Sequence, residues 1–187
     1  MKWLACLMCC LLLCVPAAYG EDDLDSMTNE ELMQLINRAY AKLSMNAETD
    51  ESNTILDADG VKIVMIGSKC TEESVAANVM VINDSDMEMK VEYRGYVVNG
   101  WSIPSVTTYR YDPFTRTKGQ AVGVSGLKQK TDIVSVEDIE TVTVKYRVTQ
   151  YGEGDMQIIH RVTVDCVHEV GEGLRIVDVR TERFVYE

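Results

Sequence analysis

The sequence predicts a mainly-β protein, an antiparallel β-sandwich, and three observations support this fold class. Apolar and polar residues alternate strictly over residues 141–149, which is typical of a strand with one face in a core and one in water. A second alternating run covers 156–166, after a glycine-rich turn at 151–155. Shorter runs recur from residue 55 onward without an intervening helical pattern. Because an isolated hairpin is marginally stable, these runs should supply the strands that cover its apolar face.

The first 20 residues are typical of a cleaved export signal. A lysine precedes the apolar run of residues 3–15, and Ala18-Tyr19-Gly20 suits cleavage before Glu21. The run is shorter than the roughly 20 apolar residues that span a bilayer, and no later stretch is apolar enough. We therefore expect a secreted protein without an integral membrane segment. A lipid anchor is the alternative, but Leu13 is not the small residue that lipidation of Cys14 would require.

Charge and length restrict the partners and the number of domains. The 187-residue chain has a net charge of −12, and the signal contains one basic residue and no acidic residue. The mature chain is therefore still more acidic, which argues against nucleic acid and anionic lipid as partners. Its length suits one domain with an appendage.

Two cysteines, Cys70 and Cys166, lie outside the signal. In an exported chain such a pair favours a disulfide, and closing a loop of this size would stabilise the fold by roughly 4 kcal/mol in the chain-entropy model. The alternative is two separate thiols. A metal site would need more ligands than these and two histidines, so we expect no metal and no cofactor.

Residues 21–54 predict an acidic lead, an amphipathic helix and a linker. Thr28 and Glu31 have the spacing of a capping box, and apolar residues then recur at helical spacing as far as Leu43. A helix of this length is not stable alone, so its apolar stripe should dock on the following domain or on a neighbouring copy. Its polar face is not basic, which argues against a membrane surface.

Turns and strands follow one another in the domain predicted for residues 55–187. Asp57–Gly60 should form a turn, and residues 67–73 a loop that holds Cys70. Besides the two alternating runs, the predicted strands cover 61–66, 74–83, 87–98, 105–111, 120–127 and 174–186.

Three segments in this order resemble the immunoglobulin-like domains of exported bacterial proteins of unknown function. They are VMVINDSDMEMKVEYRGYVVNG from Val79, then Gly119-Gln120, then SVEDIETVTVKYRVTQ from Ser135. Those domains carry a strand ending in Asn, a polar turn, a strand running to Asn-Gly, and later a Ser-x-Glu-Asp-Ile turn before a long strand. The resemblance covers about residues 55–187 and excludes the helix and both cysteines. It implies an immunoglobulin-like sandwich, exported or tethered at the cell surface, with no catalytic residues to carry over.

No local motif indicates an enzyme. His160 shares the parity of the core-facing residues of its strand, which favours a structural histidine, and His168 beside Glu169 should be solvated in a loop. Gly-x-Ser-x-Gly and glycine-rich phosphate loops are absent from the sequence, and the two cysteines outside the signal are too far apart to form a redox Cys-x-x-Cys. We therefore expect a non-catalytic protein, and an extracellular hydrolase without a recognisable motif is the alternative.

Aromatic residues cluster between the third predicted strand and the next one. Tyrosine and tryptophan are favoured at recognition surfaces, and loops on a rigid sandwich are common binding sites. The alternative is that Trp101 and Tyr109 plug the end of the core. We expect an exported binding or structural module for an extracellular protein or glycan, or else a subunit of a cell-surface assembly packed through the helix. The predicted contact residues are Tyr96, Asn99, Trp101, Tyr109 and Phe114.

Overall fold

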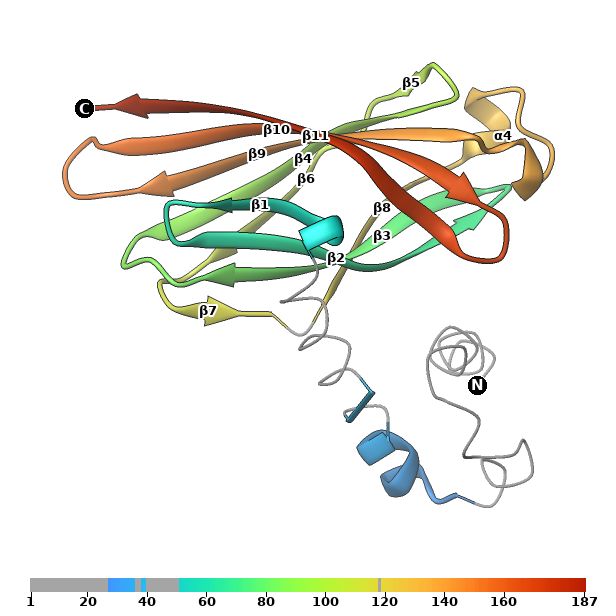
Figure 1. The fold of residues 1–187 in the computed structure, drawn as a ribbon, viewed down its shortest axis with the longest axis horizontal. Helices are drawn as coiled ribbons and strands as arrows, with labels where there is room; N and C mark the ends of the chain where they lie inside the picture. Colours follow the sequence, from blue (N-terminus) through green and yellow to red (C-terminus); the bar gives the residue numbers. More distant parts are fainter. Residues whose placement is uncertain (1–26, 36–37, 40–50, 118) are drawn as a thin grey trace. The chain divides into compact units, whose positions relative to one another are not determined.

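The computed structural model describes residues 27–35, 38–39, 51–117 and 119–187 (Figure 1). The predicted export signal, the acidic lead, part of the predicted helix and the first half of the linker lie outside these residues. The chain divides into two compact units, residues 1–46 and 47–187. No helix within the described ranges is long and apolar enough to cross a membrane.

In the first unit, residues 29–35 are helical. The Thr28 amide donates to Glu31 Oε2 over 2.8 Å, and the Glu31 amide donates to Thr28 Oγ1 over 3.3 Å. These are the reciprocal bonds of a capping box. The hydrogen bonds that the Thr28 amide and hydroxyl donate to the Glu31 carboxylate lower the pKa of Glu31.

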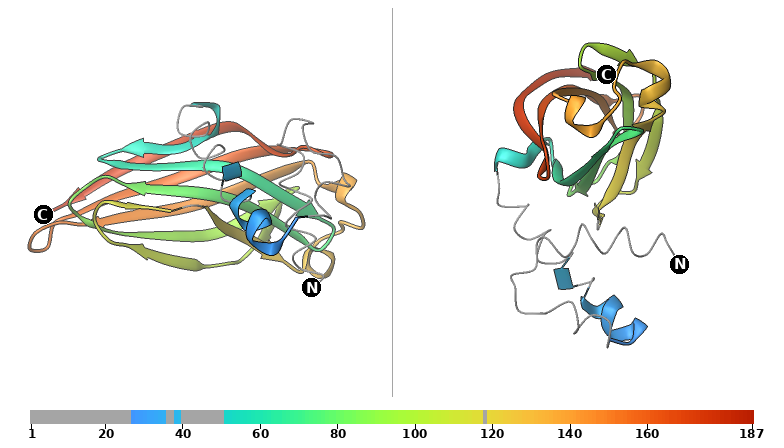
Figure 2. Two further views of the ribbon diagram at one scale, coloured as in Figure 1. Left: turned by 90° about the horizontal axis from the view of Figure 1, so that it is seen from below. Right: turned by 90° about the vertical axis from the view of Figure 1, so that its right-hand side faces the viewer.

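The second unit consists of two antiparallel sheets, so the predicted mainly-β sandwich is confirmed (Figures 1 and 2). In sheet A the strand order is β1-β2-β3, and both β7 and β8 pair with the far edge of β3. Sheet B has the order β11-β10-β9-β4, and both β5 and β6 pair with β4. Sheet A comprises β1 (Thr54–Ala58), β2 (Val61–Thr71), β3 (Ser74–Asn83), β7 (Thr115–Arg116) and β8 (Gln120–Ser125). Sheet B comprises β4 (Glu88–Val98), β5 (Trp101–Ile103), β6 (Thr107–Tyr111), β9 (Thr141–Tyr151), β10 (Gln157–Glu169) and β11 (Gly173–Tyr186).

The described residues of this unit also form three short helices. They are η1 (Glu51–Asn53) before β1, α4 (Leu127–Lys130) after β8, and η2 (Val136–Asp138) before β9. The predicted strand over 120–127 ends at Ser125, because Gly126 takes a left-handed φ of 75° and Leu127 is fully buried at the start of α4.

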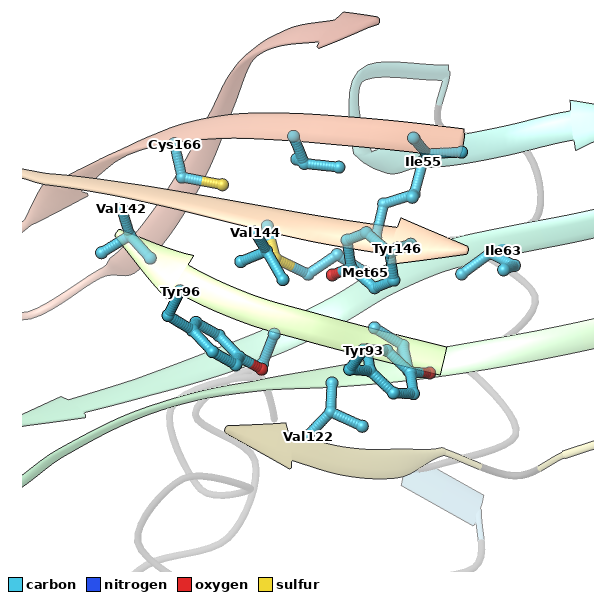
Figure 3. Packing of buried hydrophobic residues seen from close by; sticks show 14 of the residues in the cluster. Ile55, Ile63, Met65, Tyr93, Tyr96, Val122, Val142, Val144, Tyr146 and Cys166 are labelled. Atoms are coloured by element: carbon cyan, nitrogen blue, oxygen red, sulfur yellow. The ribbon is translucent and has the colours of Figure 1, made fainter. Parts of the chain in front are cut away.

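The core lies between the sheets, where the inward residues of each alternating strand meet (Figure 3). Tyr93 of β4 and Tyr146 of β9 pack edge to face there, with ring centroids 5.0 Å apart. A smaller buried cluster of Val64, Met80 and Ile82 occupies the other face of sheet A. Burial of these side chains supplies the main driving force for folding.

Hydrogen bonds join the sheets at both edges. On one edge the Leu174 amide of β11 donates to Ser68 Oγ of β2 over 2.6 Å. Gly173 permits this approach, because a Cβ on it would lie 2.4 Å from Ser68 Oγ and its φ is 98°. On the other edge the Tyr111 hydroxyl of β6 donates to the Gln120 side-chain oxygen of β8. The sandwich is therefore held along both sides.

The predicted loop over 67–73 is wrong, because β2 continues to Thr71 and contains Cys70. A register shift between Met65 and Gly67 turns Ser68 and Cys70 toward the interior and leaves Gly67 and Lys69 exposed. Such a bulge breaks the alternation on which the prediction depended. The predicted strand over 74–83 coincides with β3.

Candidate functional site

The five predicted contact residues do not form one surface. Tyr96 is only 2% exposed in the core, and Tyr109 is half-buried with its ring edge to face with that of Tyr93. Trp101 and Phe114 are 48% and 69% exposed. The core residues are therefore unavailable to a ligand outside the sandwich.

The two exposed aromatic side chains lie at opposite ends of the sandwich. The Trp101 end is joined to the start of β9, where the Asn99 amide donates to the Thr141 carbonyl. The Phe114 amide donates to the Ser85 carbonyl, and Ser85 contacts Gln150 near the end of β9. Nine residues of a strand span about 30 Å, so these aromatic residues cannot serve one small site.

Asn99 is a structural residue of the turn before β5. Its φ is 48°, a conformation that asparagine tolerates better than most residues. Its side-chain oxygen accepts hydrogen bonds from the amides of Glu140 and Thr141 over 2.9 and 3.0 Å, and its amide nitrogen donates to the Asp138 carbonyl. The side chain thus connects the end of β4 to the start of β9.

Trp101 stands directly after this turn. Its indole Nε1 donates to Asp132 Oδ1 over 3.1 Å, while Ile103, two residues on, is buried in the core. Trp101 is therefore held at the surface and does not plug the core, whereas the half-buried Tyr109 does pack against the core.

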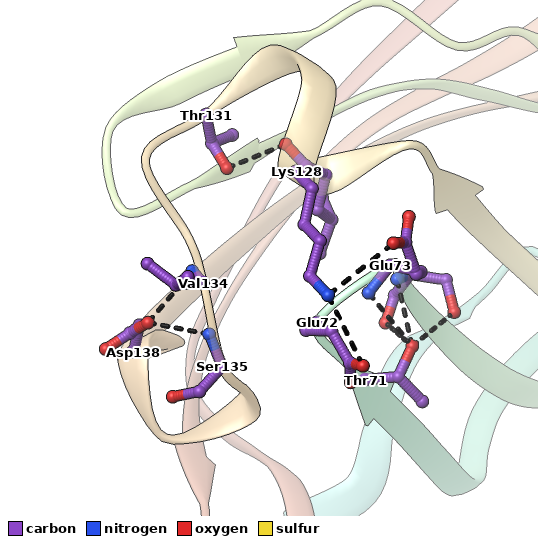
Figure 4. Close-up of polar contacts among 10 residues, drawn as sticks. Thr71, Glu72, Glu73, Lys128, Thr131, Val134, Ser135 and Asp138 are labelled. Atoms are coloured by element: carbon purple, nitrogen blue, oxygen red, sulfur yellow. Dashed lines mark hydrogen bonds and ion pairs between the residues drawn. The ribbon is translucent and has the colours of Figure 1, made fainter.

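The loop that carries Asp132 is itself ordered by hydrogen bonds (Figure 4). Thr131 Oγ1 donates to the Leu127 carbonyl over 2.9 Å. Asp138 Oδ2 accepts from the amides of Val134 and Ser135 over 2.9 and 2.8 Å, and these bonds lower the pKa of Asp138. Val134, in the same loop, is 75% exposed. We call Trp101, Asp132 and Val134 the Trp101 surface.

His160 is almost completely buried, and its predicted core-facing position is confirmed by its 1% exposure. Its Nε2 lies 2.9 Å from Asp59 Oδ2, within ion-pair distance, but neither ring nitrogen meets hydrogen-bond geometry with any described residue. Burial lowers the pKa of His160, so the imidazole is neutral at pH 7. Because neither ring nitrogen has a hydrogen-bond partner, His160 does not activate a hydroxyl group of any described residue.

Arg183 completes this cluster from β11. Its Nε and Nη2 donate to the Asp59 carboxylate over 2.7 and 3.0 Å, and this bidentate contact lowers the pKa of Asp59. Gln150 donates to the Asp59 carbonyl over 3.0 Å. The cluster therefore joins the turn between β1 and β2 to sheet B, which is a structural role.

His168 is not the solvated loop residue that we predicted. It lies in β10, and its Nδ1 is 3.0 Å from the Ile139 carbonyl. The strand extends three residues beyond the predicted end at 166, so that His168 contacts the segment before β9.

The predicted disulfide is absent, since Cys70 and Cys166 are both free thiols. Burial raises the pKa of Cys70 to about 11 and that of Cys166 to about 12. The prediction depended on the expected compartment and took no account of burial, which disfavours the thiolate that disulfide chemistry requires. In the described ranges no three His, Cys, Asp or Glu side chains are grouped to hold a metal ion.

Comparison with known proteins gives no further assignment: no family model and no curated protein matches this chain.

Proposed function

We propose that this protein is an exported, non-catalytic recognition module with an immunoglobulin-like sandwich, which binds an extracellular protein or glycan through the Trp101 surface. The observation that supports this is a half-exposed indole that is held in place by a hydrogen bond from its own ring to Asp132. An exposed tryptophan that is already ordered loses little conformational entropy when a partner covers it.

The surroundings of the indole fit a partner with both apolar and hydroxyl or amide groups. Val134 is an exposed apolar residue two positions after Asp132 in the same loop, and Asp132 retains acceptor capacity beside the ring nitrogen. Aromatic residues combined with a few polar groups of fixed direction are common in recognition sites. Residues 1–20 have the pattern of an export signal, and an exported protein would meet its partner outside the cell.

The test is a binding screen of residues 21–187 against glycans and extracellular proteins, with two variants beside the wild type. Trp101→Ala removes the indole, whereas Phe114→Ala removes an even more exposed aromatic ring at the opposite end of the sandwich. We expect Trp101→Ala to weaken a specific interaction at least 10-fold and Phe114→Ala to leave it unchanged, with both variants folded by circular dichroism. Equal losses in the two variants, or an interaction unaffected by either, would contradict the proposal.

A further inference from the structure

The outer face of sheet B is basic, although the whole chain has a net charge of −12. The strand registers and burial pattern place eight of the 18 Lys and Arg side chains on this face, but only six of the 30 Asp and Glu side chains. The cations are Lys90, Arg94, Arg110, Lys145, Arg147, Arg161, Arg175 and Arg180; the anions are Glu88, Glu92, Asp165, Glu169, Asp178 and Glu182. Charge is therefore segregated between this face and the rest of the surface.

Three of these cations are neutralised at the margins of the face. Arg110 pairs with Glu88 over 3.0 Å, and Arg175 and Arg180 pair with Glu169 and with Asp165. The remaining five, Lys90, Arg94, Lys145, Arg147 and Arg161, constitute what we call the basic face.

One carboxylate, that of Glu92, lies close to three of the five cations of the basic face. Glu92 is nearly buried, with its side chain 11% exposed, and it lies 3.3 Å from Lys90 Nζ, 3.3 Å from Arg94 Nη2 and 3.8 Å from Arg147 Nε. Burial raises the pKa of Glu92, but Lys90 and Arg94 together outweigh burial and hold that pKa below its usual value. One negative charge among three positive charges leaves a local excess of two.

Neither of the other two cations forms an ion pair with a carboxylate of the described residues. Arg161 lies opposite Arg147 in the register, and like charges in that arrangement repel. Its guanidinium stacks on Phe184, 4.7 Å from the ring centroid, and Lys145 is exposed. Glu182, opposite Arg161 on β11, makes no ion pair with it among the described residues. The Arg147 Nε atom is buried without a hydrogen-bond partner in the described part of the chain.

We propose that the basic face binds a linear anionic polysaccharide that bears carboxylate groups. The cations stand about 5 Å apart across strands and about 7 Å apart along a strand, which is an array suited to regularly repeated charges. Thr108 lies beside Glu92 and Thr163 beside Lys145 in the register, and their hydroxyls can bond to sugar hydroxyl groups. The site shares no residue with the Trp101 surface and goes beyond the function proposed for it.

Charge density favours this partner over nucleic acid. A duplex carries one negative charge per roughly 1.7 Å, so any part extending past the basic face would meet strong repulsion from the acidic remainder of the protein. A polysaccharide with one carboxylate per sugar meets less repulsion. We therefore still expect nucleic acid not to be the partner.

The experiment uses polygalacturonate as the probe and residues 21–187 as the protein. In Lys145→Glu/Arg161→Glu two exposed cations of the basic face are reversed, and in the control Lys128→Glu/Lys130→Glu the same change in net charge is made on α4, where both side chains are exposed. We expect binding at 50 mM NaCl that weakens with salt, a loss of at least 10-fold in the first variant, and little change in the control. Fully methyl-esterified polymer, which lacks the charge, should not bind.

Three results would overturn the proposal. They are no binding of polygalacturonate by the wild type at 50 mM NaCl, equal losses in the two double variants, and duplex DNA bound as tightly as the polysaccharide. The variant Trp101→Ala separates the two proposals, because it changes the Trp101 surface and should leave polygalacturonate binding unaltered. The function proposed for the Trp101 surface can therefore fail while the basic face still binds.

Discussion

The substitution Asp59→Asn tests whether the buried polar cluster stabilises the sandwich. Asn preserves the shape of the side chain and tolerates the φ of 50° at this position, so the main change is loss of the negative charge. The lost charge accepts two hydrogen bonds from Arg183 and contacts His160. A hydrogen bond to a charged group contributes about 1.5–3 kcal/mol, but solvent screens the half-exposed Arg183. We therefore expect the free energy of unfolding to fall by about 1–2 kcal/mol.

Urea unfolding of residues 21–187 at pH 7 measures this loss. The control is Asp178→Asn, which breaks an exposed pair with Arg180 on the same strand, at a distance of 3.3 Å and with side chains 62% and 55% exposed. Exposed pairs contribute little, so we expect a change below about 0.5 kcal/mol. Equal losses in the two variants would refute the argument that the Asp59 cluster is stronger because it is more buried.

The same cluster predicts the dependence of stability on pH. Because burial lowers the pKa of His160, acidification below about 6.5, the unfolded value, favours the unfolded state, which binds the proton more readily. Arg183 lowers the pKa of Asp59 in the folded state. The ionised Asp59 therefore contributes its full share to the free energy of unfolding above pH 3.8, the pKa of an unperturbed Asp, and this share is lost as the pH falls through the lower pKa of the folded state. Both effects destabilise the protein in acid. In Asp59→Asn the second loss should disappear from a series of urea titrations between pH 7 and pH 3, and an unaltered profile would contradict this assignment.

Three further predictions concern other parts of the sandwich. Asn99→Gly keeps the left-handed turn but removes three side-chain hydrogen bonds, so urea unfolding should show a loss of about 1–3 kcal/mol; no loss would mean that water replaces them. Gly123→Ala would place a Cβ 2.5 Å from the Val75 carbonyl oxygen, whereas a Cβ at Gly67 meets nothing within 4 Å; the melting temperature should fall only in the first variant. Iodoacetamide at pH 8 should alkylate Cys70 and Cys166 only after denaturation, by mass spectrometry, because burial raises both pKa values; rapid native labelling would contradict their burial.

The regular strands could be predicted because their alternation is a local property. The alternating runs at 141–149 and 156–166 correspond to β9 and β10. The turn predicted at Asp57–Gly60 is confirmed only at Asp59 and Gly60, because β1 extends to Ala58. The bulge near Gly67 could not be found in the same way, because one inserted residue reverses the parity of all that follow it.

The sites were harder to predict, since they depend on contacts between distant residues. Asp59 and Arg183 are 124 residues apart, and nothing in the turn that contains Asp59 indicates a partner on the last strand. The aromatic segment around Trp101 was identified, but Tyr96 in it is a core residue. The register shift between Tyr93 and Tyr96 reverses the parity of the strand, so alternation alone would have placed Tyr96 on the outer face. The basic face could have been inferred from the outward residues of 141–149 had the register with Glu92 been known.

The pairing of β4 with β9 determines the order in which this domain can fold. β9, β10 and β11 are joined by short turns, so they can associate within their own stretch of chain. β4 ends at Val98 and β9 begins at Thr141, and their pairing must close the intervening segment. Contacts of such sequence separation form slowly, because the entropy of loop closure is lost before any pairing is gained. We expect the docking of β9, β10 and β11 on β4 to limit the folding rate. Until they dock, the edge of β4 that pairs with β9 remains without a partner strand.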